Sequence, residues 1–164
     1  MSAPQQDTPP HDAHAIAVAA CQAMWEADLA SQAMGMELIE IGPGRARLRM
    51  RVRADMCNGH KTCHGGTIFT LADSAFAFAC NSHNRVTVAQ HCSITFLAPT
   101  REGDVLTAFA EERHRTARTG LTDVAVTDSG GRVVAIFRGH SVELKGEVVP
   151  GLGGPASGAR LDPP

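Results

Sequence analysis

The stretch H-G-G-T-I-F-T-L-A-D-S-A-F-A-F-A-C-N-S-H, residues 64–83, decides the fold of this chain. From residue 67 onward it is apolar nearly all round, which predicts a helix buried by the rest of the domain. Its two glycines stand at the start, where the first amide groups of a helix have no partner within the helix. Such a helix needs other elements that wrap around it.

Strand-like runs lie on both sides of this helix. Residues 45–53, R-A-R-L-R-M-R-V-R, alternate strictly and predict a half-buried strand, paired with a run at 37–42. The arginine stripe could grip phosphates, but we interpret it as a solvated face of a sheet. Consecutive strands favour antiparallel pairing, so we expect an α+β fold with an antiparallel sheet wrapped around the long central helix. Four further runs complete that sheet: 86–97, 104–115, 119–128 and 132–144.

One domain, residues 12–145, accounts for the patterned part of the chain. Asp12 is a suitable N-cap for an alanine-rich helix that ends before Gly35. Residues 1–11 are polar and rich in proline, and residues 146–164 are rich in glycine and proline. We therefore expect both terminal segments to be disordered tails.

Composition argues against several classes of protein. Lys and Arg total 15 against 17 Asp and Glu, which is not the basic excess of a nucleic-acid binder. No apolar run is long enough to cross a membrane, and the start of the chain has no secretory signal. Five cysteines without a C-x-x-C pair are typical of reduced, cytosolic thiols. We expect a cytoplasmic protein with neither nucleic acid nor membrane as partner.

The loop before the central helix invites a metal or nucleophile interpretation, and the spacing favours neither. The cysteines and histidines of this loop lack the paired spacing of zinc modules. Cys63 and His64 are adjacent in sequence, but adjacency alone does not make a cysteine–histidine nucleophile pair. Its glycines offer more, because a carbonyl or phosphate oxygen could approach the free amides of Gly65 and Gly66 closely. A simple tight turn into the helix is the alternative. The side chains in question are Cys57, His60, Cys63 and His64.

Asp73 is a lone acid inside the apolar helix, where an ionised carboxylate is costly unless it is paired. It could accept hydrogen bonds from the hydroxyls of Thr70 or Ser74, or pair with an arginine across the core. Otherwise it is a functional candidate. Gly65 lies eight residues earlier, roughly 12 Å along the axis, so one carbonyl cannot touch both residues of one helix. If both act on one carbonyl, the protein must be a dimer.

The run N-G, four residues, H-G-G, four residues, L-A-D-S-A-F-A at 58–77 resembles the hotdog-fold acyl-CoA thioesterases of the phenylacetic acid degradation (PaaI-type) branch. Similar runs are M-W-E-A-D in the first helix, T-F-L-A-P at 95–99 and A-I-F-R-G at 135–139. The resemblance implies homodimers, commonly paired into homotetramers. It also implies hydrolysis of phenylacetyl-CoA and ring-hydroxylated relatives, with no cofactor beyond the coenzyme A of the substrate.

The resemblance also suggests roles for individual residues. Gly65 would donate its N–H to the oxyanion, and Asp73 of the partner chain would be the catalytic carboxylate, either as general base or as nucleophile. His64 would shape the pocket, and Ala27 stands where the family leads us to expect asparagine. Asn58, Gly59 and Gly66 would contact the substrate. For the CoA phosphates we expect Arg113, Arg115 and Arg118, although a solvated charged turn is an equal alternative.

Three other functions are alternatives. A hotdog hydratase is disfavoured because its D-x-x-x-x-H order is absent, with His64 preceding Asp73. Hydrolysis of other esters, medium-chain or benzoyl-type, stays open. So does a catalytically idle sensor or scaffold that binds acyl-CoA without releasing free CoA. Phe69, Phe76 and Phe78 are expected to be mostly core, with one or two lining an acyl pocket.

Overall fold

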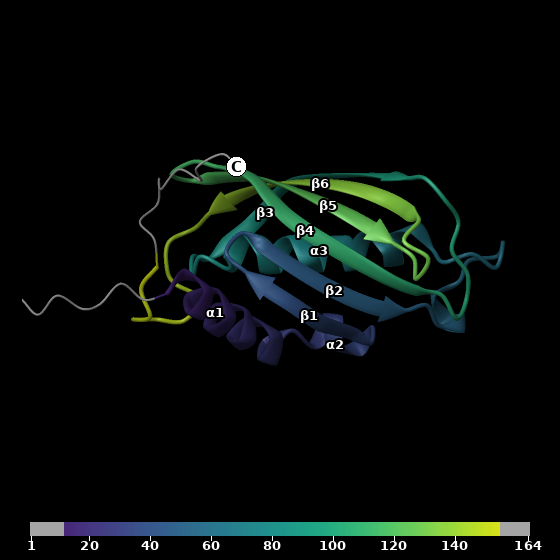
Figure 1. The fold of residues 1–164 in the computed structure, drawn as a ribbon, viewed down its shortest axis with the longest axis horizontal. Coiled ribbons are helices and arrows are strands. Elements are labelled where there is room, and N and C mark those ends of the chain that lie inside the picture. The colour runs from purple at the N-terminus through teal and green to yellow at the C-terminus, as the bar shows by residue number, and fades with distance from the viewer. Residues whose placement is uncertain (1–11, 155–164) are drawn as a thin grey trace, which may run out of the picture.

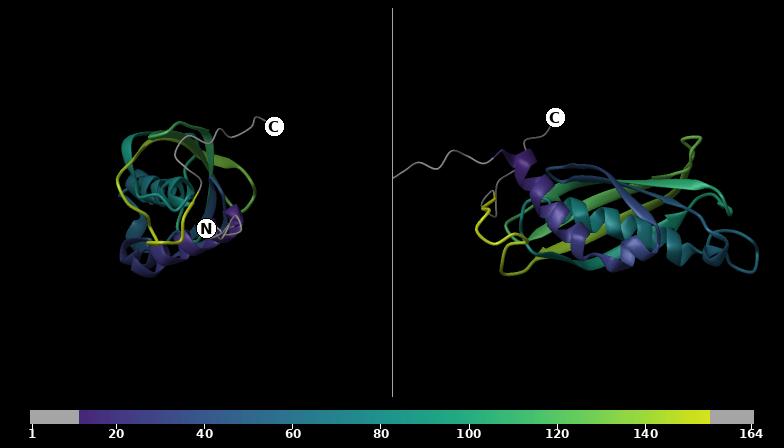
Figure 2. Two further views of the ribbon diagram at one scale, coloured as in Figure 1. Left: turned by 90° about the vertical axis from the view of Figure 1, so that its left-hand side faces the viewer. Right: turned by 90° about the horizontal axis from the view of Figure 1, so that it is seen from below.

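The structure is a computed structural model that describes residues 12–154, and one curved sheet surrounds one central helix (Figure 1). The end-on view of Figure 2 shows the strands arching over α3, with α1 beneath the open side of the arch. The elements are α1 (Ala13–Ala27), α2 (Leu29–Ala33), β1 (Met36–Gly42), β2 (Arg45–Arg51), the short 3-10 helix η1 (Ala54–Met56), α3 (Gly65–Asn81), β3 (Thr87–Phe96), β4 (Val105–Arg115), β5 (Thr119–Thr127) and β6 (Val133–Glu143).

The sheet has six strands in the order β1-β2-β4-β5-β6-β3, and every neighbouring pair is antiparallel. This confirms the predicted α+β fold, in which an antiparallel sheet wraps around the long central helix. β1 and β3 are the edge strands. β3 pairs only with β6 within the described residues, so a ten-residue strand leaves one row of backbone groups available.

The first helical region differs from the single helix predicted between Asp12 and Gly35. Asp12 is the N-cap as expected, and its carboxylate accepts the N–H of His14 at 3.1 Å. Asp28 then ends α1, and its carboxylate accepts the N–H of Ser31 at 3.0 Å, which starts α2. An aspartate satisfies the free amides at a helix start better than it fits a helix interior, so the chain breaks there.

The arginine stripe of β2 is a solvated face, as interpreted. Arg47 pairs with Glu40 at 3.1 Å and Arg49 with Glu37 at 2.6 Å, and all four side chains reach solvent. The Arg47 guanidinium also lies 4.7 Å from the centroid of the Phe109 ring. Exposed pairs of this kind add little stability. The alternating residues Ala46, Leu48, Met50 and Val52 are buried.

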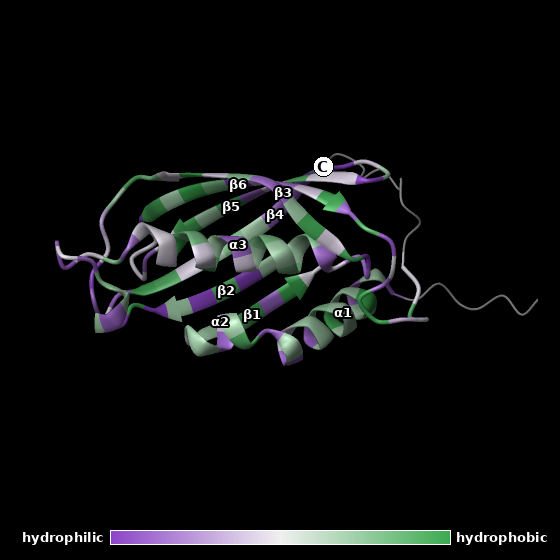
Figure 3. Cartoon of the chain, turned by 180° about the vertical axis from the view of Figure 1, so that it is seen from behind, coloured by the Kyte–Doolittle hydropathy of each residue, from purple (hydrophilic) through white to green (hydrophobic). Residues whose placement is uncertain are grey.

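The core lies between α3 and the concave face of the sheet; in Figure 3 apolar residues alternate with polar ones along the strands, and most of α3 is apolar. The ring of Phe137 packs edge-on against Phe69 at 5.3 Å between centroids and lies 5.8 Å from Phe76. Gly139 makes this packing possible, because a Cβ there would lie 2.6 Å from the Phe76 ring. Trp25 packs 6.0 Å from Phe78. The phenylalanines of α3 are therefore mostly core residues, as predicted.

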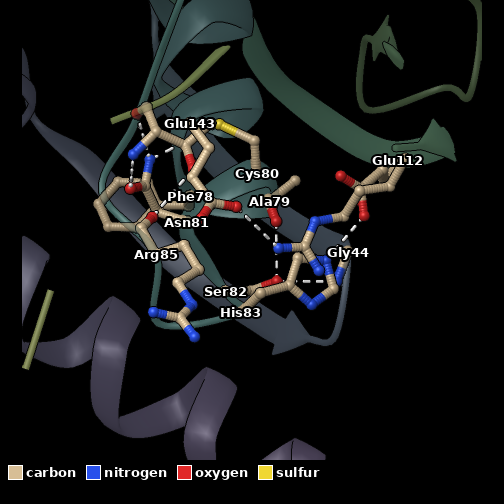
Figure 4. Close-up of polar contacts among 12 residues, drawn as sticks. Gly44, Phe78, Ala79, Cys80, Asn81, Ser82, His83, Arg85, Glu112 and Glu143 are labelled. Atoms are coloured by element: carbon tan, nitrogen blue, oxygen red, sulfur yellow. Dashed lines mark hydrogen bonds and ion pairs between the residues drawn. The ribbon is translucent and has the colours of Figure 1, made fainter. Parts of the chain in front are cut away.

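A buried polar cluster fastens the end of α3 to the sheet (Figure 4). His83 Nε2 lies 2.7 Å from Glu112 Oε2, with 6% and 2% of the two side chains exposed. The N–H of Gly44 donates to Ser82 Oγ at 2.7 Å, and the N–H of Glu112 donates to the Gly44 carbonyl at 2.8 Å. Losing one partner would leave the other polar group buried alone, which is costly. The cluster therefore sets the position of α3 against β4 and the β1–β2 turn.

The predicted tail is ordered in its first part. Residues 146–154 belong to the described structure and pack against the loop that follows α3. Asn84 accepts the N–H of Val149 at 2.8 Å and donates to the carbonyl of Gly153 at 2.8 Å. The boundary predicted at 145 is therefore wrong, because the side chain of Asn84, 65 residues before Val149 in the sequence, holds this segment. The remaining predicted tails, 1–11 and 155–164, lie outside the described residues.

Among residues 12–154, no helix is both long enough and apolar enough to cross a membrane.

Candidate active site

Asp73 lies in the middle of α3, partly buried, and lacks a strong partner. Neither hydroxyl considered for it bonds to it in the described structure, where Thr70 donates to the Gly66 carbonyl at 2.8 Å and Ser74 Oγ lies 2.9 Å from Ser31 Oγ. Within the described chain no arginine, lysine or histidine pairs with it. Among residues 12–154 its carboxylate has a single, weak hydrogen-bond contact, from the Cys92 thiol at 3.9 Å.

This environment changes the acidity of Asp73. Burial raises the pKa of its carboxyl group, and the hydrogen bond from Cys92 offsets only part of that shift. A carboxylate that is desolvated and poorly paired is a stronger base than one in water. A raised pKa of this origin is typical of carboxyl groups in functional sites, so Asp73 stays a functional candidate.

A mostly apolar cavity of about 450 Å³ opens beside Asp73. Its size falls in the ~300–1,000 Å³ range of small-molecule pockets. Residues from four parts of the chain form it, including Met24 of α1, Phe76 of α3, Val88 of β3 and Val148 of the C-terminal segment. One of the three phenylalanines of α3 therefore contributes to a pocket, as expected.

The start of α3 is organised by His64. His64 is the N-cap, and its Nδ1 accepts the N–H of Gly66 at 2.9 Å. The amide of Gly66 is therefore already bonded within the chain and is not a free donor for a substrate oxygen. The N–H of Gly65 takes part in none of the hydrogen bonds among residues 12–154. It stands at the positive end of the helix dipole, where it can receive a negative oxygen.

Gly65 faces a second cavity of about 340 Å³, lined also by Phe96, Leu97 and Thr100. A Cβ at Gly65 would lie 2.9 Å from the Phe96 ring, so glycine permits this close approach. Asp73 does not line this cavity, and Gly65 does not line the larger one. One chain therefore presents the two groups in separate places, about 12 Å apart by helix rise.

The loop at 57–63 is a small hairpin, closed by an isolated bridge between Cys57 and Cys63. Asn58 stabilises its turn, because the side-chain oxygen accepts the N–H of His60 at 2.9 Å and the hydroxyl of Thr62 at 3.2 Å. Gly59 at the tip is exposed. The oxygen of Asn58 is thus committed to the loop, whereas its amide group has no partner within the described residues.

Neither a thiol nucleophile nor a metal site is assembled in this loop. Burial raises the pKa of Cys63 to about 11, so its sulfur is a thiol at neutral pH. The His64 ring nitrogen nearest the backbone is occupied by Gly66. Across residues 12–154, no group of three or more histidine, cysteine or acidic side chains is arranged to hold a metal ion.

The three arginines expected to bind CoA phosphates do not form one site. Arg113 lies on the outer face of the sheet, paired with Glu111 and, at 3.5 Å, with Asp123. The Arg115 side chain is 8% exposed and pairs with Glu143 at 3.3 Å. The register of β4 and β5 shifts between Glu112 and His114, which separates the two arginines. Arg118, in the exposed β4–β5 turn, forms no ion pair within the described chain.

Two groups near Asp73 escaped prediction from sequence. Cys92 faces α3 from β3. Its period-two spacing from Ile94 is the sequence signal that could have predicted this orientation. Residues 147–148 also line the larger cavity, but no periodic pattern of apolar residues in this segment predicts that position. Ala27, where the resemblance led us to expect asparagine, is exposed at the end of α1 and does not line that cavity.

Comparison with known proteins agrees with this architecture. A family model for the thioesterase superfamily matches residues 60–135. Acyl-coenzyme A thioesterase PaaI of Escherichia coli (strain K12) is 44% identical over 126 residues, which cover 77% of this chain and 90% of that protein. The structure of the E. coli PaaI protein from the phenylacetic acid degradation operon superposes with a TM-score of 0.82 at 42% identity, covering 83% of this chain and 99% of that one.

A more distant likeness is to a hypothetical thioesterase from Streptococcus pneumoniae solved with coenzyme A. It has a TM-score of 0.65 and 27% identity, and covers 68% of this chain and 87% of that one. The resemblance stated from sequence is confirmed by these relatives. The chain belongs to the thioesterase superfamily, as a hydrolase with the hotdog fold and a homologue of PaaI.

Proposed function

We propose that this protein hydrolyses aryl-acetyl esters of coenzyme A, phenylacetyl-CoA and its ring-hydroxylated relatives, to the free acid and CoA. The observation that carries the proposal is the poorly paired carboxylate of Asp73 beside an apolar cavity of about 450 Å³. The identity to PaaI supports the substrate class. We place the reaction in the cytoplasm, with no cofactor beyond the coenzyme A of the substrate.

The chemistry follows from two groups. The carboxylate of Asp73 removes a proton from a water molecule as its oxygen attacks the thioester carbonyl carbon. The carbonyl oxygen becomes negative and accepts the Gly65 N–H at the positive end of a helix. The carbon–sulfur bond then breaks, and CoA leaves as a thiolate that takes up a proton. Direct attack by Asp73, giving a mixed anhydride that water hydrolyses, is the alternative.

The site is completed by a second copy of the chain. Gly65 and Asp73 of one helix line separate cavities, so one thioester meets both groups only if α3 of a partner runs antiparallel alongside. The edge of β3 offers the means, because its unpaired backbone can extend the sheet into a second copy. Val88 and Phe96 on this strand are 42% and 50% exposed. We propose a homodimer as the working unit, assembled into a homotetramer.

For the CoA phosphates, Arg118 is the remaining candidate of the three arginines, since it has no competing ion pair among the residues described. His64 contributes by holding the Gly66 amide, which leaves the Gly65 N–H as the free donor. Asn58 and Gly59 would reach the substrate through the side-chain amide of Asn58 and the exposed tip of the loop.

A panel of CoA esters tests the reaction. We expect release of free thiol to be fastest with phenylacetyl-CoA and its 3- and 4-hydroxyl derivatives, and slower with benzoyl-, acetyl- and medium-chain esters. The measurement is kcat/KM for each ester with a thiol reagent. A faster medium-chain or benzoyl ester would overturn the substrate class. Binding of every ester without any release of CoA would instead support the sensor reading.

Mixed dimers test the shared site. A chain with Asp73→Asn and a differently tagged chain with Gly65→Pro, which lacks the N–H, are co-expressed and purified through both tags. In such a dimer one site is doubly damaged and the other intact, so we expect about half the wild-type turnover from two chains that are nearly inactive alone. Were both groups drawn from a single chain, the mixed dimer would stay as inactive as its parents.

A further inference from the structure

The C-terminal segment 146–154 is held firmly by Asn84, a residue that is 0% exposed. Asn84 has a φ of +58°, a conformation that asparagine tolerates better than most residues. Its side chain accepts the N–H of Val149 at 2.8 Å and donates to the carbonyls of Val149 at 3.1 Å and Gly153 at 2.8 Å. One side chain thus satisfies three backbone groups of a segment without regular structure.

Further contacts hold both ends of the segment. The N–H of Val86 donates to the carbonyl of Gly146 at 3.2 Å. The Glu147 carboxylate accepts the N–H of Gly151 at 2.7 Å, which closes the turn between them. Gly154 lies so close to the loop after α3 that a Cβ there would be 2.5 Å from the His83 carbonyl oxygen. The segment is therefore a fixed wall rather than a loose end.

This wall faces the same cavity as Asp73. Glu147 and Val148 line it together with Phe76 and Val86. The cavity follows α3 from Asp73 to Asn81, eight residues or roughly 12 Å along the axis. The bond from Val86 places the segment beside the end of α3, far from Asp73. A thioester carbonyl at Asp73 would therefore direct the distal end of its acyl group toward Val148.

The lining restricts the chemistry of that acyl group. Asp73 and Glu147 are the charged residues among those that line the cavity, and both are acidic, which disfavours an anionic acyl group. The polar groups of Asn81 are already used, since its amide donates to the Thr87 carbonyl at 2.8 Å and its oxygen accepts the Thr87 N–H at 2.9 Å. Neutral, apolar acyl groups suit such walls best.

We infer that the segment 146–154 is the end wall of the acyl cavity, and that Val148 limits the size of the neutral acyl group that the enzyme accepts. This inference rests on the proposed thioesterase function and adds a specificity-determining residue to it. The segment lies outside residues 60–135, the part of the chain that matches the family model.

Substitutions at Val148 test the inference through ratios of kcat/KM across acetyl-, hexanoyl-, octanoyl- and phenylacetyl-CoA. Val148→Phe is expected to lower the ratio for phenylacetyl- over acetyl-CoA at least ~10-fold, since a pocket one or more methylenes too small discriminates by that much. Val148→Ala is expected to raise the ratio for octanoyl- over phenylacetyl-CoA about 10-fold. Asn84→Asp turns a carboxylate toward the carbonyls of Val149 and Gly153, loosens the wall, and should shift the ratios as Val148→Ala does.

Val149 provides the matched control, because it is the next residue of the segment and does not line the cavity. Val149→Ala should leave both ratios unchanged. A uniform change for all esters in the Val148 variants would overturn the inference and place the segment beside the pantetheine arm. Equal shifts from Val148→Ala and Val149→Ala would overturn it as well.

A binding measurement separates this inference from the proposed function. The probe is S-(2-phenylethyl)-CoA, a thioether that cannot be hydrolysed, titrated by calorimetry against free CoA. We expect Val148→Phe to weaken binding of the thioether at least ~10-fold relative to free CoA. If the wild type hydrolyses no ester but shows this pattern, the wall is supported and the thioesterase function fails. If it hydrolyses the esters without the pattern, the wall fails alone.

Discussion

Replacing Asp73 with asparagine is expected to lower kcat for phenylacetyl-CoA by about 100- to 10,000-fold, the usual contribution of a general base. Asparagine preserves the shape of the side chain and removes its ability to take a proton. Steady-state release of free thiol measures the loss. Ser74→Ala is the matched control, since Ser74 is the adjacent helix residue and its hydroxyl bonds to Ser31. Full activity in the asparagine variant would remove Asp73 from the mechanism.

The same variant has a predictable effect on pH dependence and stability. Burial raises the pKa of Asp73, so the acid limb of the wild-type pH–rate profile should lie above the ordinary range of an aspartate. A raised pKa in the folded state also means that folding stability is lost as pH rises through that pKa. We therefore expect Asp73→Asn to melt at a higher temperature than wild type near pH 8, with the gap closing in acid.

Gly65→Pro is expected to lower kcat by about 100- to 1,000-fold, the cost of losing one oxyanion donor. Proline removes the N–H, and the first position of a helix tolerates proline well. The preceding residue, His64, already has φ −63° and ψ 134°, which suits a residue before proline. The measurement is again kcat, with circular dichroism to show that the helix is kept.

Gly65→Ala is the control for this substitution. It keeps the N–H and brings a Cβ to the same place, 2.9 Å from the exposed ring of Phe96, which must move in both variants. The difference between the proline and alanine variants therefore isolates the amide hydrogen. Equal losses in the two would assign the effect to crowding at Phe96 and exclude the proposed oxyanion role.

Much of the fold could be predicted because its signals are local. Period-two alternation located the strand at 45–53, and the nearly continuous apolar run located the central helix. The break of the first helix at Asp28 was missed, because alanine-rich flanks conceal a capping residue whose effect depends on the Ser31 amide. Strong helix propensity on both sides does not outweigh one well-placed cap.

The sequence singles out the two residues on which the proposed site rests, but not their surroundings. Asp73 is conspicuous because a lone acid contradicts its apolar context. The sequence also does not show that His64 turns back to accept the Gly66 amide. Arg113 and Arg115 were expected to lie together because strand residues two apart share a face. A one-residue bulge between them redirects the side chains to different faces, and the sequence does not reveal that bulge. The wall at 146–154 was taken for a tail because one buried asparagine, distant in sequence, holds it.

The close contact between Gly139 and Phe76 links the packing of the core to the shape of the cavity, two properties that proteins often adjust separately. The ring of Phe76 rests against Gly139, where a Cβ would be 2.6 Å away, and the same residue lines the cavity beside Asp73. Any larger residue at 139 would push the helix from the sheet and reshape the cavity at once. A substitution at this contact that adapts the cavity to a new acyl group would therefore also destabilise the core.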